Sequence, residues 1–388
     1  MWFAVSPWLR LPVLLLLISG LFSSLDKHNI QMKPVTSYLF QKYNWYLLGI
    51  IVIVWLSYFL GYGLSRSFNH ALAYSFTFFG YFYFFYILTE KYNIHSEKIA
   101  KVIALSALTI CVLIIIEFVL YNFLHFNIRQ YVVTVSTDNT NDPIVAYDRK
   151  FFVSPPGVAE EPGSTALLLN IYCLIGLFYF KSHNNKKLYR LLLTFFIISH
   201  LLLYSAAGIV SVLLAWILSI LFNKNRSFKG VFFPIIMLST LFLIFQLNQD
   251  FLQTTYQYLY NKVTISDLDG SSVTRYFAWI TAWQNWTTSP WLGKGPGYGA
   301  ETLITGYLSV ILTILSDTGI FSFILFSLFI ISNFLILKKI KKHTQLLSIS
   351  LITALIHFSV ISDFYHAPFW ILTVLIRKIY HEEQKEVI

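Results

Sequence analysis

The feature that most limits what this chain can fold into is a series of long apolar segments separated by charged loops. A helix that crosses a bilayer needs about 20 mostly apolar residues, and about eleven segments approach this length. They are 8–25, 43–62, 68–88, 99–121, 163–180, 188–204, 207–222, 230–247, 319–337, 344–362 and the short 367–376. The pattern predicts an all-α polytopic membrane protein of about 11 (10–12) transmembrane helices, with residues 1–388 forming a single integral membrane domain.

The composition supports a membrane protein. Charged residues make up 12% of the chain and hydrophobic residues 56%, whereas soluble domains carry about 25% charged residues. This excludes a soluble globular enzyme and a disordered chain. Cys111 and Cys173 lie in separate apolar segments, which excludes a disulfide scaffold and a cysteine-rich zinc site. No metal-ligand spacing is present, and we interpret Asp267 and Asp269 as acids of a turn.

The basic residues determine the predicted orientation. Lys and Arg outnumber Asp and Glu by 28 to 18, and 20 of the 28 lie in loops on one side of the predicted membrane. Loops rich in Lys and Arg stay cytoplasmic. The distribution therefore predicts a cytoplasmic C-terminus and an external N-terminus. Because these residues lie in short loops, the positive charge does not indicate a nucleic-acid partner.

Two stretches on the external side are long, namely 122–162 and 248–318. Long loops are uncommon unless they are functional. Within the second, residues 303–316 are apolar but number only 14. We expect this segment to dip into the membrane and return, or to lie in the interface, rather than to cross. The loops place the expected functional site on the external face.

Four ionisable residues, His70, Glu117, His200 and His357, lie within predicted spans, each in the outer third. Such groups are costly inside a membrane, which makes them functional candidates. Each alone is explained more simply as an interfacial or hydrogen-bonded packing residue. As a group, they favour a site at the outer leaflet.

The first long loop combines cations with carboxylates. Arg149 and Lys150 are followed by Glu160 and Glu161, directly before Pro162. The cations could hold a phosphate, and a carboxylate could act as general base toward a sugar hydroxyl. The alternative is helix capping, because proline and an acid are both common at a helix start. Capping explains one of the glutamates but not the whole group.

The second loop predicts a helix that begins near residue 271. Arg275, Trp279, Ala282 and Trp286 are spaced to share one face of it. The tryptophans could simply form an interfacial belt. An arginine in an aromatic, apolar setting requires an anion, and the nearest anions are lipid phosphates. Arg275 is therefore the strongest candidate for binding a phosphate.

Further candidates follow toward the C-terminus. The sequence GKGPGYG at 293–299 predicts a tight turn, whose backbone N–H groups and Lys294 could instead line a phosphate. It lacks the spacing of a nucleotide-binding P-loop. Tyr298 of this turn is a candidate glycan contact, as is Trp279. His366, in the external connection 363–368, could hydrogen-bond a substrate or be an ordinary polar loop residue.

The order of these motifs resembles the O-antigen polymerase and ligase family of bacterial envelope enzymes. The resemblance rests on Arg275 followed by Trp279, on the sequence SPWLGKG at 289–295, on SDTGI at 316–320, and on EPGS at 161–164. The sequence YSAAG at 204–208 is similar to the tip of the family's middle hairpin. Together these motifs cover roughly residues 140–340, and each is loose when taken alone.

The resemblance implies a GT-C-like glycosyltransferase of the bacterial inner membrane with its active site facing the periplasm. The donor would be a glycan on undecaprenyl diphosphate. The implied roles are charge stabilisation by Arg275 with Arg149, Lys150 and Lys294, and proton removal by Glu161, Glu160 or His366. The implied reaction inverts the anomeric centre and needs no cofactor or metal. The implied partners are the lipid-linked oligosaccharide, membrane lipids and a chain-length regulator protein.

Two departures from the family pattern bear on the activity. The hairpin tip has Ala206 where the family often has arginine, which weakens the case for a second phosphate-binding arginine. Ligases usually carry a histidine near the end of the large loop, and residues 301–306 contain none. The sequence therefore favours a polymerase, with a ligase as the alternative. A flippase for lipid-linked sugars is the alternative of another class, but transporters often contain internal repeats, and we find none here.

Overall fold

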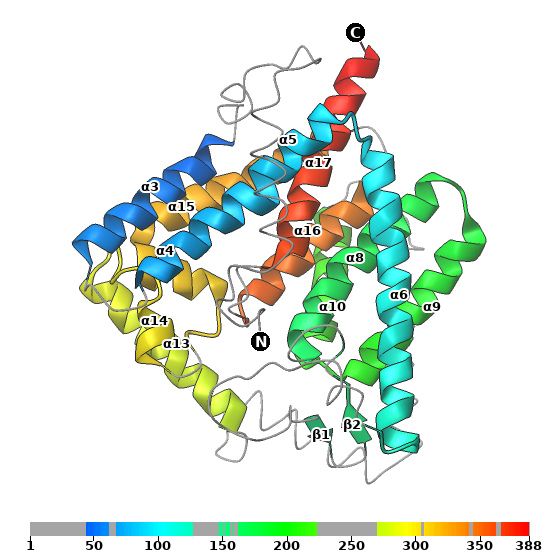
Figure 1. The fold of residues 1–388 in the computed structure, drawn as a ribbon, viewed down its shortest axis with the longest axis horizontal. Helices are drawn as coiled ribbons and strands as arrows, with labels where there is room; N and C mark the ends of the chain where they lie inside the picture. Colours follow the sequence, from blue (N-terminus) through cyan, green and yellow to red (C-terminus); the bar gives the residue numbers. More distant parts are fainter. Residues whose placement is uncertain are drawn as a thin grey trace.

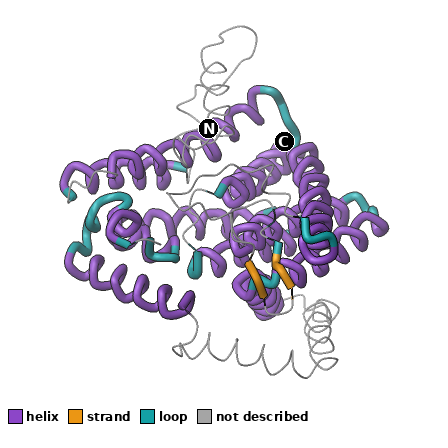
Figure 2. Tube along the Cα trace, turned by 60° about the horizontal axis from the view of Figure 1, so that its bottom comes forward, coloured by secondary structure: helices purple, strands orange, loops and turns teal. Residues whose placement is uncertain are grey.

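A computed structural model describes residues 44–61, 67–126, 147–149, 152–155, 157, 162–222, 270–303, 306–340, 344–361 and 366–387. These residues are almost entirely helical (Figures 1 and 2). The exception is one antiparallel pair of short strands, β1 (Tyr147–Arg149) and β2 (Phe152–Ser154). The predicted helical class is thus confirmed, apart from this hairpin, which the sequence pattern did not predict.

Most of the helices fall on the predicted apolar segments. In chain order they are α3 (Trp45–Leu60), α4 (Ser67–Phe76), the π-helix η1 (Thr77–Phe84), α5 (Phe85–Lys91), α6 (Ser96–Phe123), α8 (Pro162–Ser182), α9 (Lys186–Leu203), α10 (Ala206–Phe222), α13 (Gly270–Thr288), α14 (Tyr298–Thr302), α15 (Val310–Lys339), α16 (Gln345–Phe358) and α17 (Ala367–Val387). The predicted spans 8–25 and 230–247 lie outside the described residues.

Four of the described helical segments are long and apolar enough to cross a membrane: Ser67–Lys91, α6, α8 and α15. Large apolar side chains are exposed along α6, for example Val102 and Leu113, and along α15, for example Ile324 and Ile331. Exposed rows of this kind suit contact with lipid tails. The chain is therefore an integral, multi-pass membrane protein.

Helix α8 forms the centre of the bundle and contacts α6, α9, α10, α16 and α17. Gly176 permits the close approach of two of these neighbours. A Cβ at this position would lie 2.7 Å from Leu192 of α9 and 3.1 Å from the Cα of Ala104 on α6. Small residues allow membrane helices to pack closely without a hydrophobic driving force between them. This packing fixes the helix whose first residue follows Glu161.

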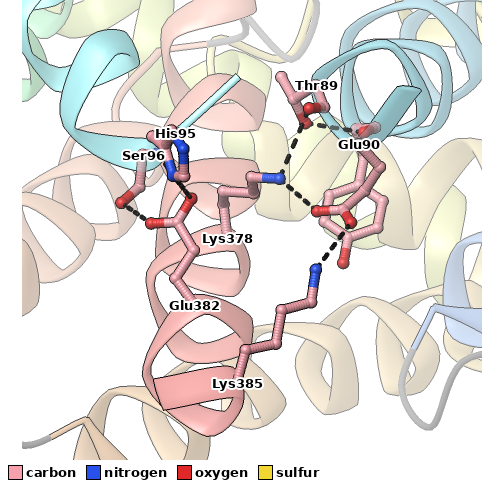
Figure 3. A network of polar contacts seen from close by, with 8 residues as sticks. Thr89, Glu90, His95, Ser96, Lys378, Glu382 and Lys385 are labelled. Atoms are coloured by element: carbon pink, nitrogen blue, oxygen red, sulfur yellow. Dashed lines mark hydrogen bonds and ion pairs between the residues drawn. The ribbon is translucent and has the colours of Figure 1, made fainter. Parts of the chain in front are cut away.

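A polar network joins α17 to the end of α5 and the beginning of α6 (Figure 3). The Glu90 carboxylate pairs with Lys378, and its second oxygen lies 3.7 Å from the Nζ of Lys385. The Glu382 carboxylate accepts hydrogen bonds from the backbone N–H of Ser96, at 2.9 Å, and from the Ser96 hydroxyl. These contacts anchor the C-terminal helix at the end of the bundle opposite β1 and β2 (Figure 1).

Candidate functional site

Helix α13 confirms the helix predicted in the second long loop. Ala278 and Ala282 are almost completely buried, and Arg275 and Trp279 are half-buried beside them. On the opposite side, Phe277 is 61% exposed. The predicted face therefore does pack against the protein. The helix contacts α15, so Arg275 is presented from a packed element.

A groove of about 440 Å³ lies between α13 and the beginning of α15. It is lined by Tyr276, Trp279, Ile280, Trp283, Gln284 and Leu312. At Arg275, one helical turn from Trp279, the Nε atom is buried, as is the indole Nε1 of Trp279. Neither nitrogen has a hydrogen-bond partner among the described residues. A buried donor without an acceptor is unfavourable, so this end of the groove is suited to a ligand that accepts hydrogen bonds.

The phenol of Tyr307 holds α13 in position. It accepts one hydrogen bond from Asn285 Nδ2 of α13 and one from Ser316 Oγ of α15, both at 2.8 Å. Burial, followed by the nearby Asp317 carboxylate, raises the pKa of Tyr307, so the phenol stays neutral. The hydroxyl therefore bridges the two helices that form the groove.

The glycine-rich turn pairs with a break in α15. Lys294 N donates to the Ser316 carbonyl at 2.8 Å, and Gly295 N donates to the Asp317 carbonyl at 3.0 Å. On the other side of the break, Ile320 N donates to the Pro290 carbonyl at 2.9 Å. The turn thus lies alongside α15 in the way an extended strand would. Its N–H groups and its carbonyl pair with backbone groups of α15 that the break leaves without a partner inside the helix.

The break occurs at Gly319, where φ is 76° and ψ is −175°. Only glycine adopts this backbone region readily. A Cβ here would lie 2.1 Å from the Trp291 carbonyl oxygen, so the site also excludes a side chain on steric grounds. Residues 310–318 are helical before the break, and they overlap the segment 303–316 that was expected to be re-entrant or interfacial. That placement relative to the membrane stays a prediction.

The carboxyl group of Asp317 is buried beneath the turn. Its Oδ2 accepts a hydrogen bond from Gly297 N at 2.8 Å, and its Oδ1 accepts a longer one from Gly299 N at 3.4 Å. The N–H groups of 293–295 also donate within the protein. The prediction of a tight turn is confirmed, and these N–H groups are occupied rather than available to line a phosphate.

Arg275 and Lys294 lie at opposite ends of α13. The 13 residues from Arg275 to the last residue of the helix span about 20 Å at 1.5 Å each, and Lys294 follows beyond that end. The Lys294 side chain is only 8% exposed. Tyr298, at the start of α14, and His366, directly before α17, are half-buried. The structure therefore does not bring Lys294 to the phosphate candidate Arg275.

The carboxylate candidates Glu160 and Glu161 lie outside the described residues, as does Lys150. Arg149 belongs to β1, but its side chain is not among those described. The neighbouring backbone is anchored, because Ser154 Oγ donates to the Leu203 carbonyl at 2.6 Å. In Figure 1, the first turn of α13 and this hairpin both lie toward the lower edge of the molecule.

Two of the intramembrane candidates make hydrogen bonds that stabilise this side of the bundle. The Glu117 carboxylate accepts a hydrogen bond from Gly157 N at 2.9 Å. His200 Nε2 lies 2.8 Å from Asn170 Oδ1, and Asn170 Nδ2 donates to the Gly208 carbonyl at 3.0 Å. The packing alternative is therefore supported for His200, which is fully buried. It connects α8 and α9 to the tip of the middle hairpin.

The part of the chain that matches a known protein family includes the groove and the glycine-rich turn. Residues 191–327 match the family model described as O-antigen ligase. The match begins in α9 and ends in α15, so it includes α13, the glycine-rich turn and the break at Gly319. This segment is a domain of the O-antigen ligase and polymerase family, whose members are glycan-transferring enzymes. No curated protein matches the chain significantly.

Proposed function

We propose that the protein is an O-antigen polymerase that transfers a growing glycan from undecaprenyl diphosphate to a sugar hydroxyl of another lipid-linked repeat unit. The observation that carries the proposal is the buried, unsatisfied Nε of Arg275 beside an aromatic groove, within the family domain. A donor of this class has a diphosphate joined to a long apolar chain. Arg275 offers a cation to the diphosphate, and the groove offers apolar surface to the long apolar chain.

The reaction needs a cation mainly at the leaving group. The acceptor oxygen attacks the anomeric carbon, the bond from that carbon to the diphosphate oxygen breaks, and the electron pair remains on the diphosphate. Arg275 would stabilise this developing charge through its planar guanidinium. The hydroxyl proton would pass to Glu161, or else to Glu160 or His366. Direct displacement of this kind inverts the anomeric centre.

The other predicted residues take secondary roles in this proposal. Arg149 and Lys150 would help to hold the diphosphate from the first long loop. Lys294 and Tyr298 lie beyond the far end of α13, so we propose that they contact the glycan rather than the phosphate bound by Arg275. Trp279 would contact the donor beside Arg275. We propose that the protein lies in the inner membrane with this site facing the periplasm.

The preference for a polymerase over a ligase rests on the large loop. Residues 301–306 contain no histidine at the position where ligases usually have one. Both activities use the same donor and differ in the acceptor, which is another repeat unit for a polymerase and lipid A-core for a ligase. The groove beside Arg275 concerns the donor and is compatible with both.

A deletion strain tests the assignment. Its surface glycan is separated on a gel beside that of the complemented strain, and its lipid-linked intermediates are extracted. We expect core capped by a single repeat unit, with the ladder lost. Long chains left on undecaprenyl diphosphate with bare core would instead identify a ligase. Single repeat units retained on the cytoplasmic side, with no capped core, would overturn the enzyme assignment in favour of a flippase.

A further inference from the structure

A second groove, of about 350 Å³, lies at the turn between α8 and α9. It is lined by Phe180, Lys181, Asn184, Asn185, Lys186, Tyr189 and Arg190. Three of the lining side chains are cationic, and none of the described lining residues is acidic. Lys186 and Arg190 are four residues apart on α9, so they occupy the same face of that helix. The groove is therefore a concentrated positive site, far along the bundle from α13.

The cations of this groove have no counter-charge within the described part of the chain. Lys181, Lys186 and Arg190 are all exposed and form no ion pair with another described residue. The carboxylate of Glu97, across the turn on α6, is paired instead with His183, at 2.8 Å. Like charges that converge without an anion repel one another. A bound anion would relieve this repulsion.

The position of the groove indicates that its ligand belongs to the bilayer. Lys181 lies in the last turn of α8, which is long and apolar enough to span the membrane, so the groove is at the level of the headgroups. Phe180 and the half-buried Tyr189 give it an aromatic floor. Along α9, Leu191 is 42% exposed and is available to an acyl chain. A soluble phosphate would use none of this apolar surface.

We propose that this groove binds the phosphodiester headgroup of an anionic phospholipid of the surrounding membrane. Arg190 would contact the phosphate through its planar guanidinium, and Lys181 and Lys186 would contribute point charges. Basic pockets between membrane helices are suited to such headgroups, and each nearby cation adds to the attraction of anionic lipid. The proposal is independent of the proposed transferase activity.

The test compares two double variants of the purified, delipidated full-length protein. The groove variant is Lys186→Gln with Arg190→Gln. The matched control is Lys338→Gln with Lys339→Gln, which removes two exposed lysines at the end of α15. Each variant leaves two lysines in its own loop, namely 181 and 187 or 341 and 342, so the positive charge that sets the topology is kept.

The readout is the number of dioleoylphosphatidylglycerol molecules retained in native mass spectra, together with the thermal shift that this lipid produces. We expect the wild type and the control variant to retain at least fivefold more molecules of this lipid than the groove variant does. Dioleoylphosphatidylcholine and glycerol 3-phosphate should give no comparable shift. Arg190→Lys, which keeps the charge, should retain part of the binding.

Three results would overturn the proposal. Equal loss of lipid in both double variants would show diffuse attraction to basic loops rather than a site. An equal response to the zwitterionic lipid would show that headgroup charge does not matter. An equal response to glycerol 3-phosphate would identify a site for soluble phosphate.

Discussion

Gly319→Ala should be among the most destabilising single substitutions in the described part of the chain. The backbone at Gly319 occupies a region that costs other residues about 1–3 kcal/mol. The new Cβ would also lie 2.1 Å from the Trp291 carbonyl oxygen and 2.6 Å from the Leu292 nitrogen. Relieving this overlap requires the turn to move, which breaks bonds such as that from Ile320 N to the Pro290 carbonyl. Each buried group left unsatisfied costs about 1–3 kcal/mol.

With one such group left unsatisfied, the sum is about 2–6 kcal/mol, which is a large part of the stability of most proteins. The assay is thermal unfolding of the purified protein in detergent, with yield from the membrane fraction as a second measure. Gly163→Ala is the matched control, because no other described part of the chain lies within 4 Å of its added Cβ and the residue is in a helix. We expect the control to keep or slightly raise the melting temperature. A melting temperature for Gly319→Ala equal to that of the control would refute the proposed role of the break.

Three further predictions concern buried or paired polar groups. Asp317→Asn puts an amide donor opposite a backbone N–H and should cost about 1–3 kcal/mol, measured as a lower melting temperature; no change would contradict the anchoring role. Glu117→Leu leaves Gly157 N without its acceptor and should lower stability by a similar amount, whereas Glu117→Gln should lower it less. A hydrogen bond to the Tyr179 backbone carbonyl and then the paired Glu97 carboxylate raise the pKa of His183. The His183–Glu97 ion pair should therefore stabilise the folded protein fully below about pH 6.5. This stabilisation should be lost as the pH rises through the raised pKa. Histidine NMR should show that pKa fall in Glu97→Gln, and an unchanged value would show that the pair is not formed.

The helices were the most predictable part of the fold, because each depends on local composition. The apolar segment 99–121 predicts α6, and the spacing of Arg275, Trp279 and Ala282 predicts the buried face of α13. In both cases the signal lies within one helix. The β1–β2 hairpin was missed because short strands of three residues leave no period long enough to recognise.

The candidate site was predicted only in part, because several of its contacts join distant residues. Asp317 accepts from glycines 18 and 20 positions earlier in the chain, and no local pattern shows that pairing. The glycines themselves were a signal, but it was equally compatible with a phosphate-binding turn. Arg275 and Lys294 are separated because α13 extends to Thr288, an end that the sequence pattern does not define.

The role of Arg275 in releasing the lipid diphosphate is the central claim, and transfer by purified protein tests it most directly. Proteoliposomes are supplied with repeat units linked to undecaprenyl diphosphate, and both chain elongation and released undecaprenyl diphosphate are measured. We predict elongation by the wild type and a loss of about 10²–10³ in rate for Arg275→Lys, because lysine cannot replace the planar guanidinium. Phe277→Leu, on the opposite, exposed side of the same helix, should fold equally well and keep the wild-type rate. Release and elongation at wild-type rates in Arg275→Lys would contradict the account.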